Sequence, residues 1–162
     1  GGNVSPMILE RLSREPYRLT MRRGSARIGT VPDAVQVGPK VCLINKYSAS
    51  DGDLFPWGFR ALGLGKLIGT RTWGGIVGIS GSLPYMDGTD IRVPFFTSFD
   101  PKTGSWIIEN HGVDPDILID NDPVKEWNGE DQQLDRAIQE VMKELQDRKP
   151  LPGVPTPRDF SK

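Results

Sequence analysis

The sequence predicts an α/β fold in which a sheet is flanked by helices. The apolar run at residues 40–45 is short, continuous and preceded by Pro39, as in a strand buried on both faces. A second apolar run at 67–70 follows a helical segment, and strand, helix, strand in this order implies a parallel crossover. Near the C-terminus, apolar residues recur at helical spacing and predict an amphipathic helix that covers one face of the core: Leu134, Ile138, Val141, Met142 and Leu145.

In the first half of the chain, residues 6–12 have helical spacing, with Ser5 as the expected N-cap and Pro6 at the first helical position. Residues 15–39 contain glycine and proline among basic residues, which predicts turns and short edge strands. The strand at 40–45 leads into the polar stretch 47–53, and apolar residues from 54 to 64 predict the next helix. Ser50 and Asp51 therefore lie where a strand ends and a helix begins.

In the second half, the strand at 67–70 is followed by a glycine-rich stretch at 72–78. Two alternating segments then flank Asp87-Gly88, which is a hairpin signal. Residues 106–109 predict a further short strand, and residues 112–116 a turn. After Lys149, the prolines of residues 150–162 cannot continue a helix, so we expect an extended or disordered tail.

Composition limits the classes of function. The chain has 20 basic and 21 acidic residues and a net charge of −1, so it has no overall electrostatic reason to bind nucleic acid or an anionic membrane. Cys42, the only cysteine, lies in an apolar run and predicts a buried, inert thiol. No apolar run is long enough to cross a bilayer. The abrupt start at Gly1-Gly2 suggests a piece of a longer protein, so the compartment stays open between cytoplasm and bacterial periplasm.

Ser50 is the first candidate for chemistry. At the start of a helix its hydroxyl lies near backbone N–H groups and the positive end of the helix dipole, which suits a developing oxyanion. The alternative is structural, since Ser48, Ser50 and Asp51 are all residue types that cap helices. Gly1-Gly2 offers a second set of N–H groups that can approach a bound group closely.

A complete Ser-His-acid triad inside this chain would have to use His111, its only histidine. His111 lies next to a turn, where a surface or structural role is expected. Four acidic residues follow without the spacing of a calcium loop, so they are expected to be solvated turn and cap residues: Asp114, Asp116, Asp120 and Asp122. We therefore expect no metal and no cofactor.

Four segments together resemble the tricorn and C-terminal-processing (tail-specific) serine protease family. They are GGNVS at residues 1–5, NKYSASDGD at 45–53, GTRTWGG at 69–75 and ENHGVDPD at 109–116. Their order and spacing match the family over roughly residues 1–145, and the second and fourth segments are the specific ones. The resemblance implies a crotonase-like α/β fold, of the superfamily that includes ClpP and crotonase. It also implies that Ser50 attacks the scissile carbonyl while the amides of Asp51 and Gly2 bind the oxyanion, with Gly1 the less suitable donor.

The two branches of that family differ in the catalytic base. In tail-specific proteases a lysine follows the Thr-x-Gly element, but the matching residue here is Gly75, and Lys66 does not occupy the motif position. Tricorn-type enzymes use a histidine from an upstream region, oriented by an acidic residue that matches Glu109. The resemblance therefore favours the tricorn branch, with Ser50 and Glu109 as catalytic residues and no metal.

The resulting hypothesis is a serine endopeptidase or peptide-processing enzyme that acts through an acyl-enzyme on Ser50. Residues 1–149 would be the C-terminal part of the catalytic domain, inactive alone because the base comes from the upstream part of the same polypeptide. The expected partners are a peptide or unfolded-protein substrate and, through homo-oligomerisation, further copies. The resemblance also implies an upstream helical part and a PDZ-like domain, with β-propellers as a further option.

Two alternatives stay open. One is a non-catalytic ligand- or peptide-binding module, because interphotoreceptor retinoid-binding proteins share this fold and bind apolar ligands. The other is a crotonase-type acyl-CoA enzyme, which would use the oxyanion hole on a thioester without a nucleophile. The combination of Ser50, Asp51 and Glu109 argues against the first, and the second leaves the segment around Ser50 unexplained.

Overall fold

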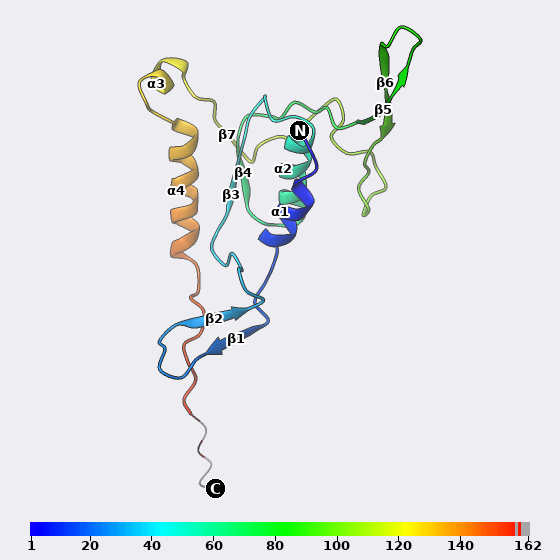
Figure 1. Ribbon diagram of the computed structural model, residues 1–162. Coiled ribbons are helices and arrows are strands. Elements are labelled where there is room, and N and C mark those ends of the chain that lie inside the picture. Colours follow the sequence, from blue (N-terminus) through cyan, green and yellow to red (C-terminus); the bar gives the residue numbers. More distant parts are fainter. Residues whose placement is uncertain (158, 160–162) are drawn as a thin grey trace.

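A three-stranded parallel sheet forms the centre of the molecule (Figure 1). The computed structural model describes residues 1–157 and 159, and the side chains of residues 80–83 lie outside that description. The strands are β3 (Val41–Ile44), β4 (Lys66–Gly69) and β7 (Ile117–Leu118), in the order β3-β4-β7. Val41 lies opposite Lys66, and Ile44 opposite Gly69. The expected α/β class and the strand, helix, strand unit are thus confirmed.

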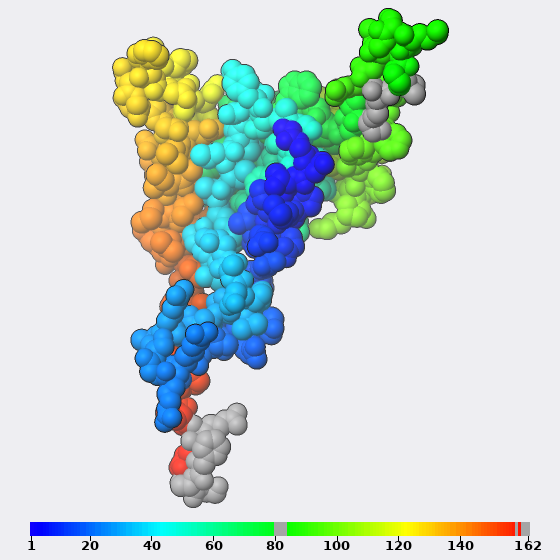
Figure 2. Space-filling model, viewed as in Figure 1, coloured from blue at the N-terminus to red at the C-terminus, as the bar shows by residue number. Residues whose placement is uncertain are grey.

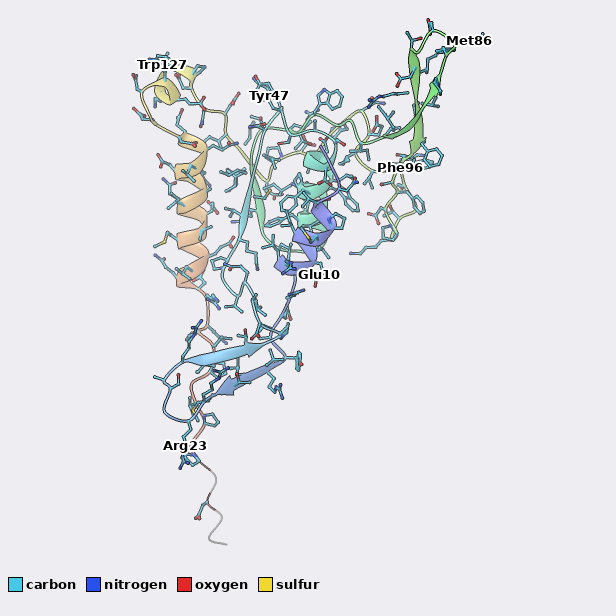
Figure 3. All side chains as sticks on the ribbon, viewed as in Figure 1. Glu10, Arg23, Tyr47, Met86, Phe96 and Trp127 are labelled. Carbon is cyan, nitrogen blue, oxygen red and sulfur yellow. The ribbon has the colours of Figure 1, made fainter. Side chains whose placement is uncertain are left out.

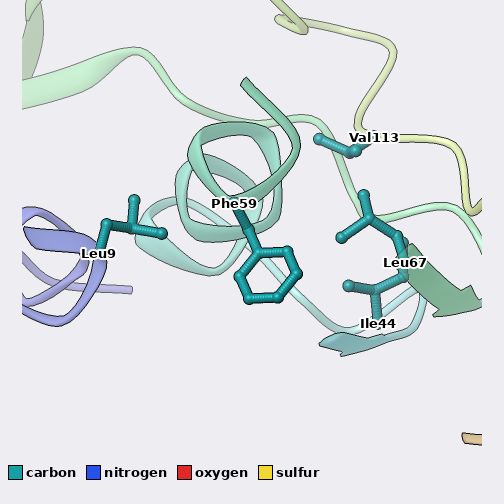
Figure 4. Packing of buried hydrophobic residues seen from close by; sticks show 5 residues of the cluster. All are labelled: Leu9, Ile44, Phe59, Leu67 and Val113. Atoms are coloured by element: carbon teal, nitrogen blue, oxygen red, sulfur yellow. The ribbon is translucent and has the colours of Figure 1, made fainter. Parts of the chain in front are cut away.

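Helix α2 (Asp51–Ala61) connects β3 to β4 and carries the centre of the core. It begins at Asp51, three residues before the first apolar residue of the expected helix, and it accommodates Pro56 in its interior. Helix α1 (Ser5–Leu12) packs against α2. Figure 4 shows the buried residues between these helices and the sheet: Leu9, Ile44, Phe59, Leu67 and Val113.

Ser5 does not cap α1, so that expectation was wrong. The helix already includes Ser5, and Val4 stands at the N-cap position without a side-chain cap. The Ser5 side chain is buried and its hydroxyl donates to Asp51. A partner 46 residues away therefore takes the hydroxyl that sequence reasoning had assigned to local capping.

Two hairpins extend from this body, one at each end of the view in Figure 1. The first pairs β1 (Arg18–Met21) with β2 (Ile28–Val31), where turns and short edge strands were expected. The second pairs β5 (Gly78–Pro84) with β6 (Asp90–Phe96), which confirms the hairpin signal at Asp87-Gly88. The space-filling view shows both as projections from the body, and Figure 3 labels Arg23 and Met86 near their tips.

The strand expected at residues 106–109 does not form. Trp106 makes a single antiparallel bridge to Phe99, and the chain then turns, with His111 N donating to Ile108 O at 3.0 Å. Asn110 has a positive φ of 60°, which a continuing strand would not allow. Two short elements that the sequence did not reveal follow, namely β7 and α3 (Pro123–Trp127).

Helix α4 (Gln132–Gln146) confirms the expected C-terminal helix but not the way in which it packs. The residues it buries are Ala137 and Glu140, whereas its apolar stripe is largely exposed: Leu134, Ile138, Met142 and Leu145 are 44–52% exposed. Polar contacts hold the helix, because Gln133 Nε2 donates to Ile44 O at 2.9 Å and Lys66 Nζ to Glu140 Oε2 at 2.7 Å. Beyond α4, residues 148–157 form no helix or strand.

The Glu140 contacts predict how stability depends on pH. Hydrogen bonds from Lys66 and then Arg136 lower the pKa of Glu140 below its usual 4.5. A lowered carboxyl pKa contributes stability above pH about 4.5 and loses it as pH falls through the folded-state pKa. We therefore expect Glu140→Gln to lower the melting temperature at pH 7, and the difference from the parent protein to shrink as the pH falls below 4. Equal differences at pH 7 and pH 3 would contradict this assignment.

Candidate functional site

Ser50 lies at the corner between β3 and α2, in a backbone conformation that few residues adopt. Its φ is 59° and its ψ is −115°, and a non-glycine residue in such a region costs roughly 1–3 kcal/mol. Ser50 occupies the N-cap position, but its side chain makes no capping hydrogen bond. The residue is exposed. Ser50 thus stands where a helix-capping residue is expected, but it does not cap the helix.

The backbone amides around Ser50 differ in whether they are hydrogen-bonded. The amides of Asp53 and Leu54 already donate to Ser50 O, at 2.9 and 3.0 Å. In the part of the chain that the structure describes, the amides of Asp51 and Gly2 have no such acceptor. The N-terminal segment lies close by, since a Cβ built on Gly1 would be 3.5 Å from Ser50 Cβ and 3.7 Å from its Oγ. Gly2 has φ 132°, which favours glycine.

The Asp51 carboxylate holds the N-terminal segment against this corner. Oδ2 accepts from Val4 N and Ser5 N, both at 3.0 Å, and Oδ1 accepts from the Ser5 hydroxyl. Asp51 is 5% exposed. The Asp51 side chain thus fixes the start of α1, which begins at Ser5, three residues after Gly2.

Glu109 lies in the turn before β7 and binds backbone amides. Oε2 accepts from Ile76 N at 2.7 Å and from Val77 N at 3.0 Å. Among the described residues, Oε1 has no such donor. Glu109 also lines a hollow of about 630 Å³, together with Val77, Asn110, His111 and other residues. Glu109 is therefore fixed by one oxygen and can accept a hydrogen bond with the other.

The glycine-rich segment at residues 72–77 connects the Ser50 corner to the Glu109 turn. Trp73 N donates to Ser48 O at 2.9 Å on one side, and Thr72 N donates to Val113 O at 3.1 Å on the other. Thr72 Oγ1 also accepts from Val113 N at 2.8 Å. The segment is thus hydrogen-bonded to both halves of the site. Sequence analysis identified this stretch only as glycine-rich and did not single out Thr72 as a structural residue.

The structure does not bring the other candidate bases to Ser50. His111 is 56% exposed and its Nε2 lies 2.7 Å from Asp114 Oδ2, where Arg71 also pairs. This hydrogen bond, before the charge of Arg71, lowers the pKa of Asp114. Lys66 begins β4, at the opposite end of the sheet from the β3 terminus that leads to Ser50, and it pairs with Glu140. A Cβ on Gly75 would overlap the Trp73 ring.

The structure accordingly brings Ser50, Asp51 and the glycine pair together, and links Glu109 to them through residues 72–77. Asp116, expected to be solvated, instead accepts from Leu67 N at 2.7 Å and pairs with Arg60, while Asp122 caps α3 as expected.

Within the described residues no group of His, Cys, Asp or Glu could hold a metal ion, and none of the helices there is long and apolar enough to span a bilayer. Burial raises the pKa of the half-buried Cys42 thiol to about 11, so the thiol is protonated at neutral pH.

Comparisons with known proteins give a consistent result. A family model described as peptidase family S41 matches residues 3–119. The chain is 42% identical to the tricorn protease of Thermoplasma volcanium over 90% of its own length and 14% of that protein's, and 39% identical to tricorn protease homolog 1 of Streptomyces coelicolor over 85% and 13%. It superimposes on a crystal structure of the tricorn protease with a TM-score of 0.82 and 40% identity, covering 90% of this chain and 14% of that one.

Proposed function

The chain belongs to peptidase family S41, and from this membership we propose that it carries the nucleophile of a serine peptidase of tricorn type. The chain spans only about 14% of the length of the curated relatives it matches, so the activity concerns the full-length protein. The observation that carries the proposal is Ser50, which has a strained backbone, an exposed side chain and a hydroxyl that makes no cap. Strain of this kind at a helix start resembles the turn on which other serine hydrolases present their nucleophile.

In the proposed reaction, Ser50 Oγ attacks the carbonyl carbon of the scissile peptide bond and gives its proton to a base. The amides of Asp51 and Gly2 donate to the oxygen that becomes negative, which stabilises the tetrahedral intermediate. The base then returns the proton to the leaving amine, and an acyl-enzyme remains on Ser50. Water, deprotonated by the same base, releases the acid product and regenerates the serine.

We propose that the base is a histidine from an upstream segment of the same polypeptide. His111 is engaged with Asp114, Lys66 with Glu140, and the space above Gly75 is occupied by Trp73. Glu109 would accept from the second nitrogen of that histidine, directly or through a hydroxyl, and so hold its tautomer. The hollow beside Glu109 provides room for such a side chain.

The finer assignment of the fold is also a proposal. We take residues 1–149 as the C-terminal part of a crotonase-like catalytic domain and residues 150–162 as a tail outside it. The parallel strands β3 and β4 with α2 between them are compatible with this assignment. A substrate of peptides or unfolded protein and assembly with further copies follow from the same family membership.

The experiment that tests the function is covalent labelling of the full-length protein with a fluorophosphonate probe. Because the probe requires an activated serine and an oxyanion hole, we expect the adduct on Ser50, identified by mass spectrometry of the peptide that contains it. A binding module would not react, and an acyl-CoA enzyme would hydrolyse thioesters while Ser50 stayed unmodified. Labelling that is equally strong in Ser50→Ala would remove the basis of the proposal.

The role proposed for Glu109 makes a separate prediction. In Glu109→Gln the amide oxygen can still accept from Ile76 and Val77, so the turn should keep its place. The charge that stabilises a protonated base is lost, and kcat should fall by about 10²- to 10⁴-fold, as when a triad aspartate becomes asparagine. The melting temperature should change little. A large loss of stability with a normal kcat would instead make Glu109 a structural residue.

A further inference from the structure

Asp53 is a buried carboxylate for which the proposed reaction has no use. It is 0% exposed, and it is the third residue of α2, two positions after Asp51. Oδ1 accepts from Gly74 N at 2.7 Å, whereas Oδ2 is buried and has no hydrogen-bond partner among the described residues. Burying a carboxylate with one oxygen unsatisfied is costly, although the helix dipole offsets part of the cost at this position. Buried polar atoms without a partner are uncommon in native structures.

Gly74, the partner of Asp53, is held on its other side by the turn that carries Glu109. Its carbonyl oxygen accepts from Asn110 N at 2.7 Å. Its φ is 90°, and a Cβ at this position would overlap the backbone N of Gly112 and lie 2.8–2.9 Å from backbone atoms of His111. Gly74 therefore fills the space between the buried carboxylate and the 110–112 backbone, with room for no side chain.

A second set of hydrogen bonds, made by Glu109 itself, connects its turn to residues 74–77. The Glu109 side chain accepts from the amides of Ile76 and Val77, two and three residues after Gly74. The Glu109 carboxylate is thus placed relative to residues 74–77, and residues 74–77 are placed relative to α2 by Asp53. Helix α2 begins immediately after Ser50.

We propose that Asp53 is a positioning residue that sets the location of the Glu109 carboxylate relative to Ser50. This inference rests on the proposed function, because it assigns Asp53 to the same site. Asp53 does not touch the substrate; it acts through Gly74 and Asn110. Ser50 and Asp53 both lie at the start of α2. The rigid start of this helix therefore fixes the position of Glu109 relative to Ser50, which catalysis requires to within about 0.5–1 Å.

Substitutions at Asp53 in the full-length protein separate positioning from mere folding. In Asp53→Asn the amide oxygen can still accept from Gly74 N, so we expect most of the activity to remain. Asp53→Ala removes the acceptor, and kcat per active site should fall by about 100-fold with little change in KM. Active sites are counted by fluorophosphonate titration, so that unfolded molecules do not enter the rate. Asp53→Ser, with an acceptor too short to reach Gly74, replaces the alanine variant if that protein is insoluble.

Asp116→Ala is the matched control, because Asp116 also accepts a backbone amide, that of Leu67 at 2.7 Å, but outside the site. It should lower the melting temperature and leave kcat per titrated site unchanged. The positioning role is overturned if Asp53→Ala and Asp53→Ser turn over normally per titrated site, or if Asp53→Asn loses as much as Asp53→Ala.

A second measurement does not depend on catalysis. Hydrogen exchange of the Asn110 and Gly74 amides should be faster in Asp53→Ala than in the parent protein and in Asp53→Asn. Unchanged exchange at both amides would show that Asp53 does not hold the turn. If the parent protein cleaves no peptides, the proposed function fails, and the exchange result still decides whether Asp53 fixes the Glu109 turn.

Discussion

Replacing Ser50 with alanine in the full-length protein should lower kcat for peptide hydrolysis by about 10⁴- to 10⁶-fold. In the proposed reaction the Ser50 hydroxyl forms the acyl-enzyme, and alanine offers no group that could replace it. The proposed oxyanion donors are backbone amides and would survive the change, so a residual rate above the uncatalysed reaction should remain. The melting temperature should not fall, since the Ser50 side chain makes no capping hydrogen bond and its backbone is already strained.

Ser48→Ala serves as the matched control for this experiment. Ser48 lies two residues earlier in the same polar stretch, and within the described part of the chain its hydroxyl accepts one long hydrogen bond, of 3.3 Å from Asn45 N. Its backbone oxygen, which Trp73 N contacts, is unaffected by the substitution. We expect Ser48→Ala to keep both turnover and probe labelling. Equal losses in the two variants would mean that the stretch acts through its structure and that Ser50 is not the nucleophile.

The second large effect concerns the 162-residue chain by itself. It should hydrolyse peptides at least about 10⁴-fold more slowly than the full-length protein even when it is folded, because the proposed base lies outside this chain. His111 is hydrogen-bonded to Asp114 on the surface. Lys66 lies at the start of β4, beside the start of β3 and away from the end of β3 that leads to Ser50. Circular dichroism of the same sample would establish that the chain is folded, and kcat/KM on a common peptide would compare it with the parent.

Adding the upstream segment, in one chain or in trans, should restore turnover. His111→Ala in the full-length protein should change kcat by less than about threefold, since the loss of an exposed pair is worth little. Rapid hydrolysis by the isolated chain, abolished by His111→Ala, would identify His111 as the base. It would also show that the assignment to the tricorn branch is wrong.

The sequence alone was sufficient for the local features of the site. An apolar run followed by small polar residues placed Ser50 between a strand and a helix, and the structure confirms that corner. The hairpin around Asp87-Gly88 and the helix near the C-terminus were also predicted correctly, because the pattern of neighbouring residues determines each of them. The resemblance that pointed to Glu109 also rested on short segments, which can be recognised in the sequence without knowledge of the fold.

Only the tertiary structure revealed what holds these features together. Asp51 bonds to Val4 across 47 residues, Asp53 to Gly74 across 21, and Glu109 to Ile76 across 33. In the sequence, Asp51 and Asp53 look like ordinary polar residues at a helix start, and residues 106–109 like a strand. A carboxylate that accepts backbone amides has no sequence preference for its partner, since every residue except proline offers the same N–H. The position of Ser50 between a strand and a helix could therefore be predicted from local pattern, whereas the hydrogen bonds that connect this corner to Glu109 became visible only in the tertiary structure.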